Sequence, residues 1–151
     1  MSDIMTKSMA RNVFYGGSLF FIAIFGALTV QSHLYASSDK SIDVAGLNES
    51  VAAGKHIWEA NACINCHTLL GEGAYFAPEL GNVMIRWGVQ DDPVAAQEAL
   101  KAWMDAMPTG IEGRRQMPQF NLTDEEYREL SDFLIWTSKI NTQGWPPNEA
   151  G

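Results

Sequence analysis

Both cysteines of the chain and one of its three histidines stand together in Cys63-Ile64-Asn65-Cys66-His67. Two thiols at this spacing can each add across one vinyl group of a porphyrin, which forms two thioether bonds. The next histidine is then held beneath the ring, where its imidazole can ligate the iron. The pattern is that of covalent haem c attachment. We therefore predict one covalent haem c, attached at Cys63 and Cys66 and ligated by His67.

A thioredoxin-type redox pair is the main alternative for the two cysteines. That pair belongs to a βαβ pattern, whereas here a helical pattern precedes the motif and a glycine-rich segment follows it. Two cysteines also exclude a disulfide framework. A structural zinc site usually needs four ligands, and the sequence has no second cluster of Cys and His. Haem attachment is the favoured interpretation.

Electron-transfer haems bind a sixth ligand, which in cytochromes c is commonly a methionine. Met84 lies in a short helical piece and Met104 in the middle of a helix, so both are expected to pack in the core. Met107 and Met117, each followed by proline, are the two contenders. Met107 ends a helix, which restricts its reach. Met117 lies in the irregular segment "GRRQMPQFN" and is predicted to be the second axial ligand.

Other polar residues near these positions have more than one interpretation. Arg114 and Arg115 beside Met117 could pair with haem propionates or form a solvated basic pair. His56 is expected to be exposed on a helix next to Lys55. His33 is expected at a membrane boundary. Neither histidine is predicted to bind iron.

The elements that position this site begin with an apolar segment. Residues 12–38 hold no Asp, Glu, Lys or Arg. A helix over residues 13–35 would be about 34 Å long at about 1.5 Å per residue, and a hydrocarbon core is roughly 30 Å thick. Lys7 and Arg11 flank its N-terminal end, and basic residues tend to stay on the cytoplasmic side.

We therefore predict that residues 1–36 form a cytoplasmic tail and a single transmembrane anchor in a bacterial inner membrane. A cleaved signal peptide is the alternative, with a small-residue site at residues 36–38. The apolar run is longer than the roughly 7–15 residues usual for such a peptide. Residues 37–46 are predicted to be a linker and residues 47–151 a periplasmic mono-haem domain.

Helical signals dominate that domain. Asn48 or Ser50 can cap a helix that continues through Trp58, and a short helical piece is expected near residues 80–86. Asp92 as a cap and Pro93 in the first turn begin a helix. In that helix the residues predicted to be buried are Val94, Leu100, Trp103 and Met104.

The last helix opens with a capping box, Thr123-x-x-Glu126, and is expected to end near Lys139. Its predicted apolar face comprises Tyr127, Leu130, Phe133, Leu134 and Ile135. No segment alternates in polarity over several residues, so we expect no sheet. The predicted fold class is all-α: one transmembrane helix followed by a helical domain of about 110 residues, within the usual size of a domain.

The charge balance limits the possible partners. The formal net charge is −8, and beyond the apolar segment 17 acidic and 8 basic side chains remain. A domain that reads phosphates needs a basic face, so nucleic-acid binding is disfavoured. An acidic surface favours solubility and could steer a basic partner.

In the order of its parts the sequence resembles the class I cytochromes c. These parts are a helix with Gly54 and Trp58, the haem motif, a Met-Pro loop at Met117 and a final amphipathic helix. In that family the first and last helices cross, and the glycine permits their close approach. The resemblance implies that Gly54 faces the segment from Tyr127 to Leu134.

Longer stretches are similar to the cytochrome c subunits of bacterial nitric oxide reductases. They read "MARNVFYGG", "GKHIWEANACINCHTLLGEGAYFAPELGNV", "GRRQMPQFNL" and "WTSKINTQGWPP". The resemblance implies a role in denitrification: the chain accepts electrons from a periplasmic cytochrome c or cupredoxin and passes them to a large membrane-embedded catalytic subunit, which reduces two NO to N2O. As an isolated chain it is then not an enzyme, and its iron is expected to be fully ligated by His67 and Met117.

The same resemblance implies a calcium ion at the interface between the two subunits. Its ligands from this chain would be the backbone carbonyl of Gly73 and the side chain of Tyr75. Oxygen donors suit this cation, and glycine allows close approach of the backbone. From the residues alone, the segment is equally a surface loop with a buried tyrosine.

Two other functions remain as alternatives. A freestanding membrane-tethered cytochrome c would shuttle electrons to various acceptors, but the segment at 37–46 is short for a flexible tether. A haem-based gas sensor would need an output segment, and none is visible after Met117.

Overall fold

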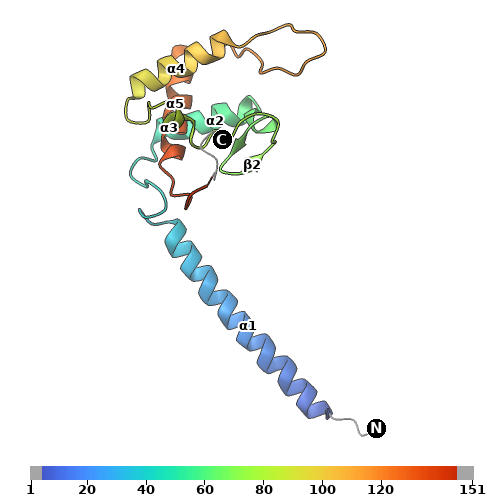
Figure 1. Ribbon diagram of the computed structural model, residues 1–151. Coiled ribbons are helices and arrows are strands. Elements are labelled where there is room, and N and C mark those ends of the chain that lie inside the picture. The colour runs from blue at the N-terminus through green and yellow to red at the C-terminus, as the bar shows by residue number, and fades with distance from the viewer. Residues whose placement is uncertain (1–4, 146–151) are drawn as a thin grey trace.

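A computed structural model of the chain describes residues 5–145, and it consists of one long helix and a small helical domain (Figure 1). The elements in chain order are α1 (Lys7–Ala36), α2 (Glu49–Ala60), the 3-10 turn η1 (Cys63–Asn65), β1 (Thr68–Leu69), β2 (Glu72–Gly73), α3 (Val83–Arg86), α4 (Pro93–Ala106) and α5 (Asp124–Ser138).

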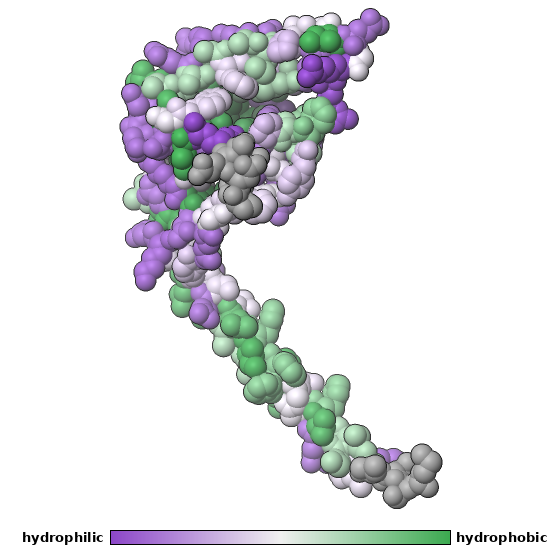
Figure 2. Space-filling model, viewed as in Figure 1, coloured by the Kyte–Doolittle hydropathy of each residue, from purple (hydrophilic) through white to green (hydrophobic). Residues whose placement is uncertain are grey.

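Helix α1 projects away from the domain and is covered by apolar side chains along most of its length (Figures 1 and 2). It has 30 residues, none of them buried, and its length and composition suffice to cross a membrane. Thr6 caps its start by accepting a hydrogen bond from the backbone N–H of Met9. The predicted spanning helix therefore forms.

The domain is organised by the crossing of α2 and α5. A side chain at Gly54 would place its Cβ 2.0 Å from the backbone oxygen of Glu129 and 2.7 Å from the Cβ of Phe133. Only glycine allows the two helices to approach this closely. The implied pairing of Gly54 with the last helix is confirmed.

The helix caps follow the sequence signals. Asn48 caps α2 through the backbone N–H of Val51, and Asp92 caps α4 with Pro93 in the first turn. Thr123 and Glu126 form the full capping box of α5. The five predicted apolar residues of α5 are all buried, with exposures of 2–7%: Tyr127, Leu130, Phe133, Leu134 and Ile135.

The buried face of α4 differs in part from the prediction. Leu100 and Met104 are buried as expected, but Val94 is 66% and Trp103 51% exposed. The buried stripe is instead Ala96, Leu100 and Met104, at a spacing of four residues. Val94 stands in the first turn outside that stripe, which explains the error.

The expectation of no sheet is also wrong in one place. The strands β1 and β2 form a two-residue antiparallel hairpin, with Thr68 opposite Gly73 and Leu69 opposite Glu72. Such a short hairpin has no room for the alternation that marks a strand in sequence. The all-α fold class stands, because every other element of residues 5–145 is helical or irregular.

Candidate haem site

The haem-attachment motif lies on one tight turn after α2. Ala62 adopts a left-handed conformation with φ of 53°, which turns the chain out of the helix and into η1. The backbone N–H groups of Cys66 and His67 then both donate to the carbonyl of Cys63, at 3.1 and 2.9 Å. This turn brings the two thiols and the imidazole to one side of the domain.

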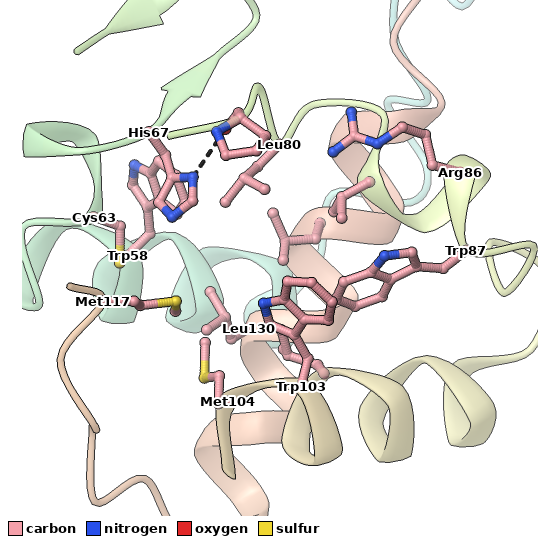
Figure 3. Close-up of a pocket in the computed structure, with 14 residues that line it drawn as sticks. Trp58, Cys63, His67, Leu80, Arg86, Trp87, Trp103, Met104, Met117 and Leu130 are labelled. Atoms are coloured by element: carbon pink, nitrogen blue, oxygen red, sulfur yellow. Dashed lines mark hydrogen bonds between the residues drawn. The ribbon is translucent and has the colours of Figure 1, made fainter. Parts of the chain in front are cut away.

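The imidazole of His67 is oriented by the segment that follows it. Its Nδ1 lies 2.8 Å from the backbone oxygen of Pro78, drawn as the dashed line in Figure 3. A carbonyl only accepts, so this contact places the ring proton on Nδ1 and leaves the lone pair of Nε2 for a metal. The histidine has the tautomer that an axial ligand needs.

Two adjoining cavities, each of about 260 Å³, share Cys63, His67 and Met117 in their walls. Cys66 lines the second. Figure 3 shows His67 and Met117 on either side of the first cavity, with Trp87 and Trp103 towards its far end. The structure thus brings together all four residues predicted to hold the haem. The other residues of the first cavity are Trp58, Pro78, Leu80, Val83, Arg86, Leu100, Met104, Leu130 and Leu134.

These residues fit a c-type haem. The donors are two thiols, an imidazole with a free Nε2 and a thioether, and the wall around them is mostly apolar, as a porphyrin requires. Burial raises the pKa of the Cys63 thiol to about 11, so this sulfur stays protonated in the folded chain at neutral pH.

The four methionines separate clearly in the fold. Met84 is fully buried in the core, as expected, and Met107 caps the end of α4 without lining either cavity. Met117 lines both cavities. Met104 is buried, as expected, but it also lines the first cavity. The cavity therefore holds a second thioether, on a helix, which the sequence did not indicate.

A buried carboxylate organises the glycine-rich ribbon, which we define as residues 68–82. Glu79 is only 6% exposed. Its carboxylate accepts hydrogen bonds from the backbone N–H groups of Leu70, Gly71 and Gly81 at 2.7–3.0 Å. The neighbouring Pro78 supplies the carbonyl that orients His67. Glu79 thus holds the ribbon in the path that positions the axial histidine.

The ionisation of Glu79 follows from these contacts. Burial alone would raise the pKa of its carboxyl. The hydrogen bonds from Gly81, Gly71, Thr68 and Leu70 outweigh burial and lower the pKa below its ordinary value. Sequence reasoning missed Glu79, and the signal that could have found it is an acidic residue between glycines that offer backbone N–H groups.

The two residues expected at a calcium ion lie on the outer side of the ribbon. Gly73 is exposed and has a φ of 126°, which favours glycine. Tyr75 is 76% exposed, and its hydroxyl donates to the backbone oxygen of Gly71 at 3.1 Å. The buried tyrosine of the alternative interpretation is therefore wrong. Both residues are thus exposed on the ribbon.

The remaining polar residues take different places. Arg115 is exposed and lies over the ring of Phe76, 4.6 Å from its centroid, while Arg114 is exposed. Arg86, which sequence reasoning did not single out, is the arginine in the cavity wall. It also donates to the backbone oxygen of Glu79 at 2.8 Å. His56 is exposed, as predicted.

Comparison with known proteins shows the family of the chain. A cytochrome c family model matches residues 51–138. A nitric oxide reductase subunit of Paracoccus denitrificans is 76% identical over 151 residues, which is the full length of both chains. The subunits of the same name from Cereibacter sphaeroides and Halomonas halodenitrificans are 68% and 60% identical, also over the full length of both chains. The chain belongs to the cytochrome c family and, within it, to the family of these nitric oxide reductase subunits.

Proposed function

We propose that this chain is the electron-transfer subunit of a membrane-bound nitric oxide reductase. It would receive single electrons from a periplasmic cytochrome c or cupredoxin and pass them to a large catalytic subunit that reduces two NO to N2O. Its full-length similarity to nitric oxide reductase subunits supports this role. The observation that carries the proposal is the pair of adjoining cavities lined by Cys63, His67 and Met117.

The donor set favours electron transfer over ligand activation. His67 and Met117 both line the cavity, so these two side chains would ligate the iron of a haem bound there. A c-type haem bound here supplies a one-electron iron couple. The chain's own residues anchor the group through two cysteines, hold the Nδ1 proton of His67 on Pro78 and surround the site with apolar side chains. An iron ligated by both residues would leave no open position for nitric oxide at this site.

The identity of the second axial ligand can be tested among the three methionines that remain after Met84. We expect Met117→His to keep the haem attached, because attachment depends on Cys63 and Cys66. Its reduction potential should fall, since a thioether ligand raises the potential and an imidazole does not. In purified protein, redox titration measures the potential. The absorbance of the Met–iron bond shows whether a methionine still ligates the iron.

Met104→Leu and Met107→Leu are the matched controls for that substitution. Both conserve volume, and only Met104 lines the cavity. We expect the Met–iron absorbance band to persist in each. Loss of the band in Met104→Leu together with its survival in Met117→His would assign the ligand to α4 instead.

The membrane arrangement is part of the proposal. Helix α1 fits an anchor in the inner membrane, and Lys7 and Arg11 favour a cytoplasmic N-terminus with the haem domain in the periplasm. A reporter enzyme fused at either end of the chain tests the orientation. Periplasmic activity from the N-terminal fusion would contradict it.

We also propose that Gly73 and Tyr75 contribute to a calcium site at the interface with the catalytic subunit. Both residues are exposed on the ribbon, and the Tyr75 hydroxyl keeps lone pairs free while donating to Gly71. Carbonyl and hydroxyl oxygens suit calcium, and the other ligands would come from the partner. Calcium analysis of the purified complex, with and without a chelator, tests the site.

Purification in mild detergent decides between a subunit and a freestanding shuttle. The subunit role predicts that a protein with b-type haem accompanies this chain, and that the preparation consumes NO with a reduced cytochrome as donor. The isolated chain should not consume NO. If the chain comes away alone under conditions that keep other membrane complexes intact, the shuttle function is the better account.

A further inference from the structure

The segment between the membrane helix and the haem domain is tied down rather than free. The backbone N–H of Asn141 donates to the oxygen of Ser41 at 2.8 Å, and its side-chain amide donates to the oxygen of Lys40 at 3.1 Å. The indole N–H of Trp136, on α5, donates to the oxygen of Asp43 at 2.8 Å. Residues on α5 and just after it thus hold the linker at three points.

The same segment reaches the last turn of α1. The side-chain amides of Asn141 and Gln143 each lie 3.4 Å from the hydroxyl oxygen of Tyr35. In Figure 1 the red chain after α5 descends to the point where α1 ends. Both amides offer N–H donors and the tyrosine oxygen can accept, so the contacts join the membrane helix directly to the haem domain.

Within the linker the chain forms short hydrogen-bonded turns. The N–H of Ser38 donates to the oxygen of Tyr35, and the N–H groups of Ser41 and Ile42 both donate to the oxygen of Ser38. The backbone N–H of Gly46 donates to the carboxylate of Asp43 at 2.8 Å. Each turn restricts backbone rotations that an extended linker would allow.

On its other side the chain after α5 meets the ribbon of the haem site. Thr142 and Trp145 close a turn through two hydrogen bonds. A Cβ at Gly71 would lie 3.6 Å from the indole of Trp145, so the ring packs against this glycine. Gly71 in turn donates to Glu79, the carboxylate that shapes the ribbon. One short segment therefore links the membrane helix, the linker and the ribbon.

We propose that Asn141 and Trp136 are positioning residues that fix the haem domain at one orientation above the membrane. This inference rests on the proposed electron-transfer function. A free linker of ten flexible residues would let its ends separate by about 17–19 Å on average. The five hydrogen bonds between residues 35–43 and residues 136–145 restrict this separation. We name these two segments and their contacts the linker bracket.

A fixed orientation matters because electron tunnelling weakens steeply with distance. If the domain swung freely, only a fraction of its orientations would place the haem edge near an acceptor in the membrane partner, and the effective rate would scale with that fraction. The linker bracket would orient the haem domain before the subunits associate, so this reduction in rate would not occur. It also excludes the wide excursions that a tethered shuttle would need.

The test uses the full haem-loaded chain, without its partner, in oriented phospholipid multilayers. Electron paramagnetic resonance of the ferric haem reports the angle of the haem to the membrane normal and the spread of that angle. The variant Asn141→Ala/Trp136→Phe removes the side-chain amide and the indole N–H while keeping an aromatic ring at position 136. Asn121→Ala, at an exposed asparagine of the loop before α5, is the control.

We expect the wild-type chain and Asn121→Ala to show a narrow spread, and the double variant a spread about twofold wider, with the haem potential unchanged. In the complex, electron transfer from this chain to its partner should slow by about two- to threefold. An equally narrow spread in the double variant would overturn the proposal. So would a wider spread accompanied by a shifted potential, because the haem site itself would then have changed. The spread is measured without the partner, so it can fail independently of co-purification.

Discussion

The crossing of α2 and α5 and the ribbon at residues 68–82 border the same haem site, yet different forces hold them. The crossing is a packed interface around Gly54, with Trp58 and Phe133 buried beside it. The ribbon has few buried side chains and depends on the hydrogen bonds of Glu79. Apolar packing holds the two helices beside the site, whereas the Glu79 carboxylate holds the loop that orients His67.

This difference predicts how each region fails. A packed crossing should be intolerant of added volume and insensitive to pH. A loop held by a buried carboxylate should tolerate changes on its outer side but respond to the charge of that carboxylate. Substitutions in the two regions can separate these behaviours.

The largest effect is expected from Gly54→Ala. In an exposed helix this change stabilises by up to about 1 kcal/mol, because alanine has the better helix propensity. At Gly54 the new Cβ would meet the backbone oxygen of Glu129 at 2.0 Å, so the two helices must separate. We expect the free energy of unfolding to fall by about 3 kcal/mol or more. Chemical denaturation followed by circular dichroism measures it.

Ala52→Val is the matched control for that substitution. Ala52 is exposed on the same helix. A β-branched residue there should cost no more than about 0.7 kcal/mol, through propensity alone. If Gly54→Ala proved neutral or stabilising, the close crossing of the two helices would be wrong.

Glu79→Gln comes next in size. The amide has one acceptor oxygen in place of two, so at least one of the three backbone N–H groups loses its partner inside the domain. We expect a loss of about 2–3 kcal/mol in the free energy of unfolding at neutral pH. Glu72→Gln is the control, because Glu72 lies on the same ribbon and is exposed. It should change little.

The pH dependence of the Glu79 contribution has a definite sign. Its pKa is lower in the folded chain than in the unfolded chain, so its contribution is fully present above the unfolded value of about 4.3. The contribution is lost as the pH falls below that value through the folded pKa. The difference between wild type and Glu79→Gln should therefore be constant from pH 7 to about pH 5 and shrink below pH 4. A difference that grew on acidification would contradict these hydrogen bonds.

Thr123→Ala should have a smaller effect, on the helix frame. It removes the hydroxyl that accepts from the backbone N–H of Glu126 at 3.2 Å. Loss of such a cap typically costs about 1 kcal/mol. Thr109→Ala, at an exposed threonine in the loop after α4, should be neutral. Thermal unfolding of the two variants side by side tests the cap.

Sequence reasoning succeeded where the structure repeats a local rule. The caps at Asn48, Asp92 and Thr123 and the buried face of α5 all follow from short patterns with a fixed period. The haem motif is similarly local, since one turn brings Cys63, Cys66 and His67 together.

It failed where a residue's role depends on neighbours distant in the chain. Trp103 was expected in the core, but it lines the cavity beside Trp87, with ring centroids 5.7 Å apart, and remains half exposed. Glu79 escaped notice because its three donors belong to a non-periodic loop. Asn141 and Lys40 of the linker are 101 positions apart, and no local pattern indicates that pairing.

The smallest effect on folding is expected from Tyr75→Phe, on the outer side of the ribbon. The hydroxyl is mostly exposed and makes one hydrogen bond to Gly71, so its loss should cost about 0.5 kcal/mol or less. If Tyr75 also binds calcium at the subunit interface, the same substitution should weaken retention of the ion by the purified complex. Calcium content after a graded chelator titration, compared between wild type and variant, measures this. A variant that kept both its stability and its calcium would show that the Tyr75 hydroxyl has no role in calcium binding. A variant that lost calcium alone would show that the inner side of the ribbon stabilises the fold and its outer side binds at the subunit interface.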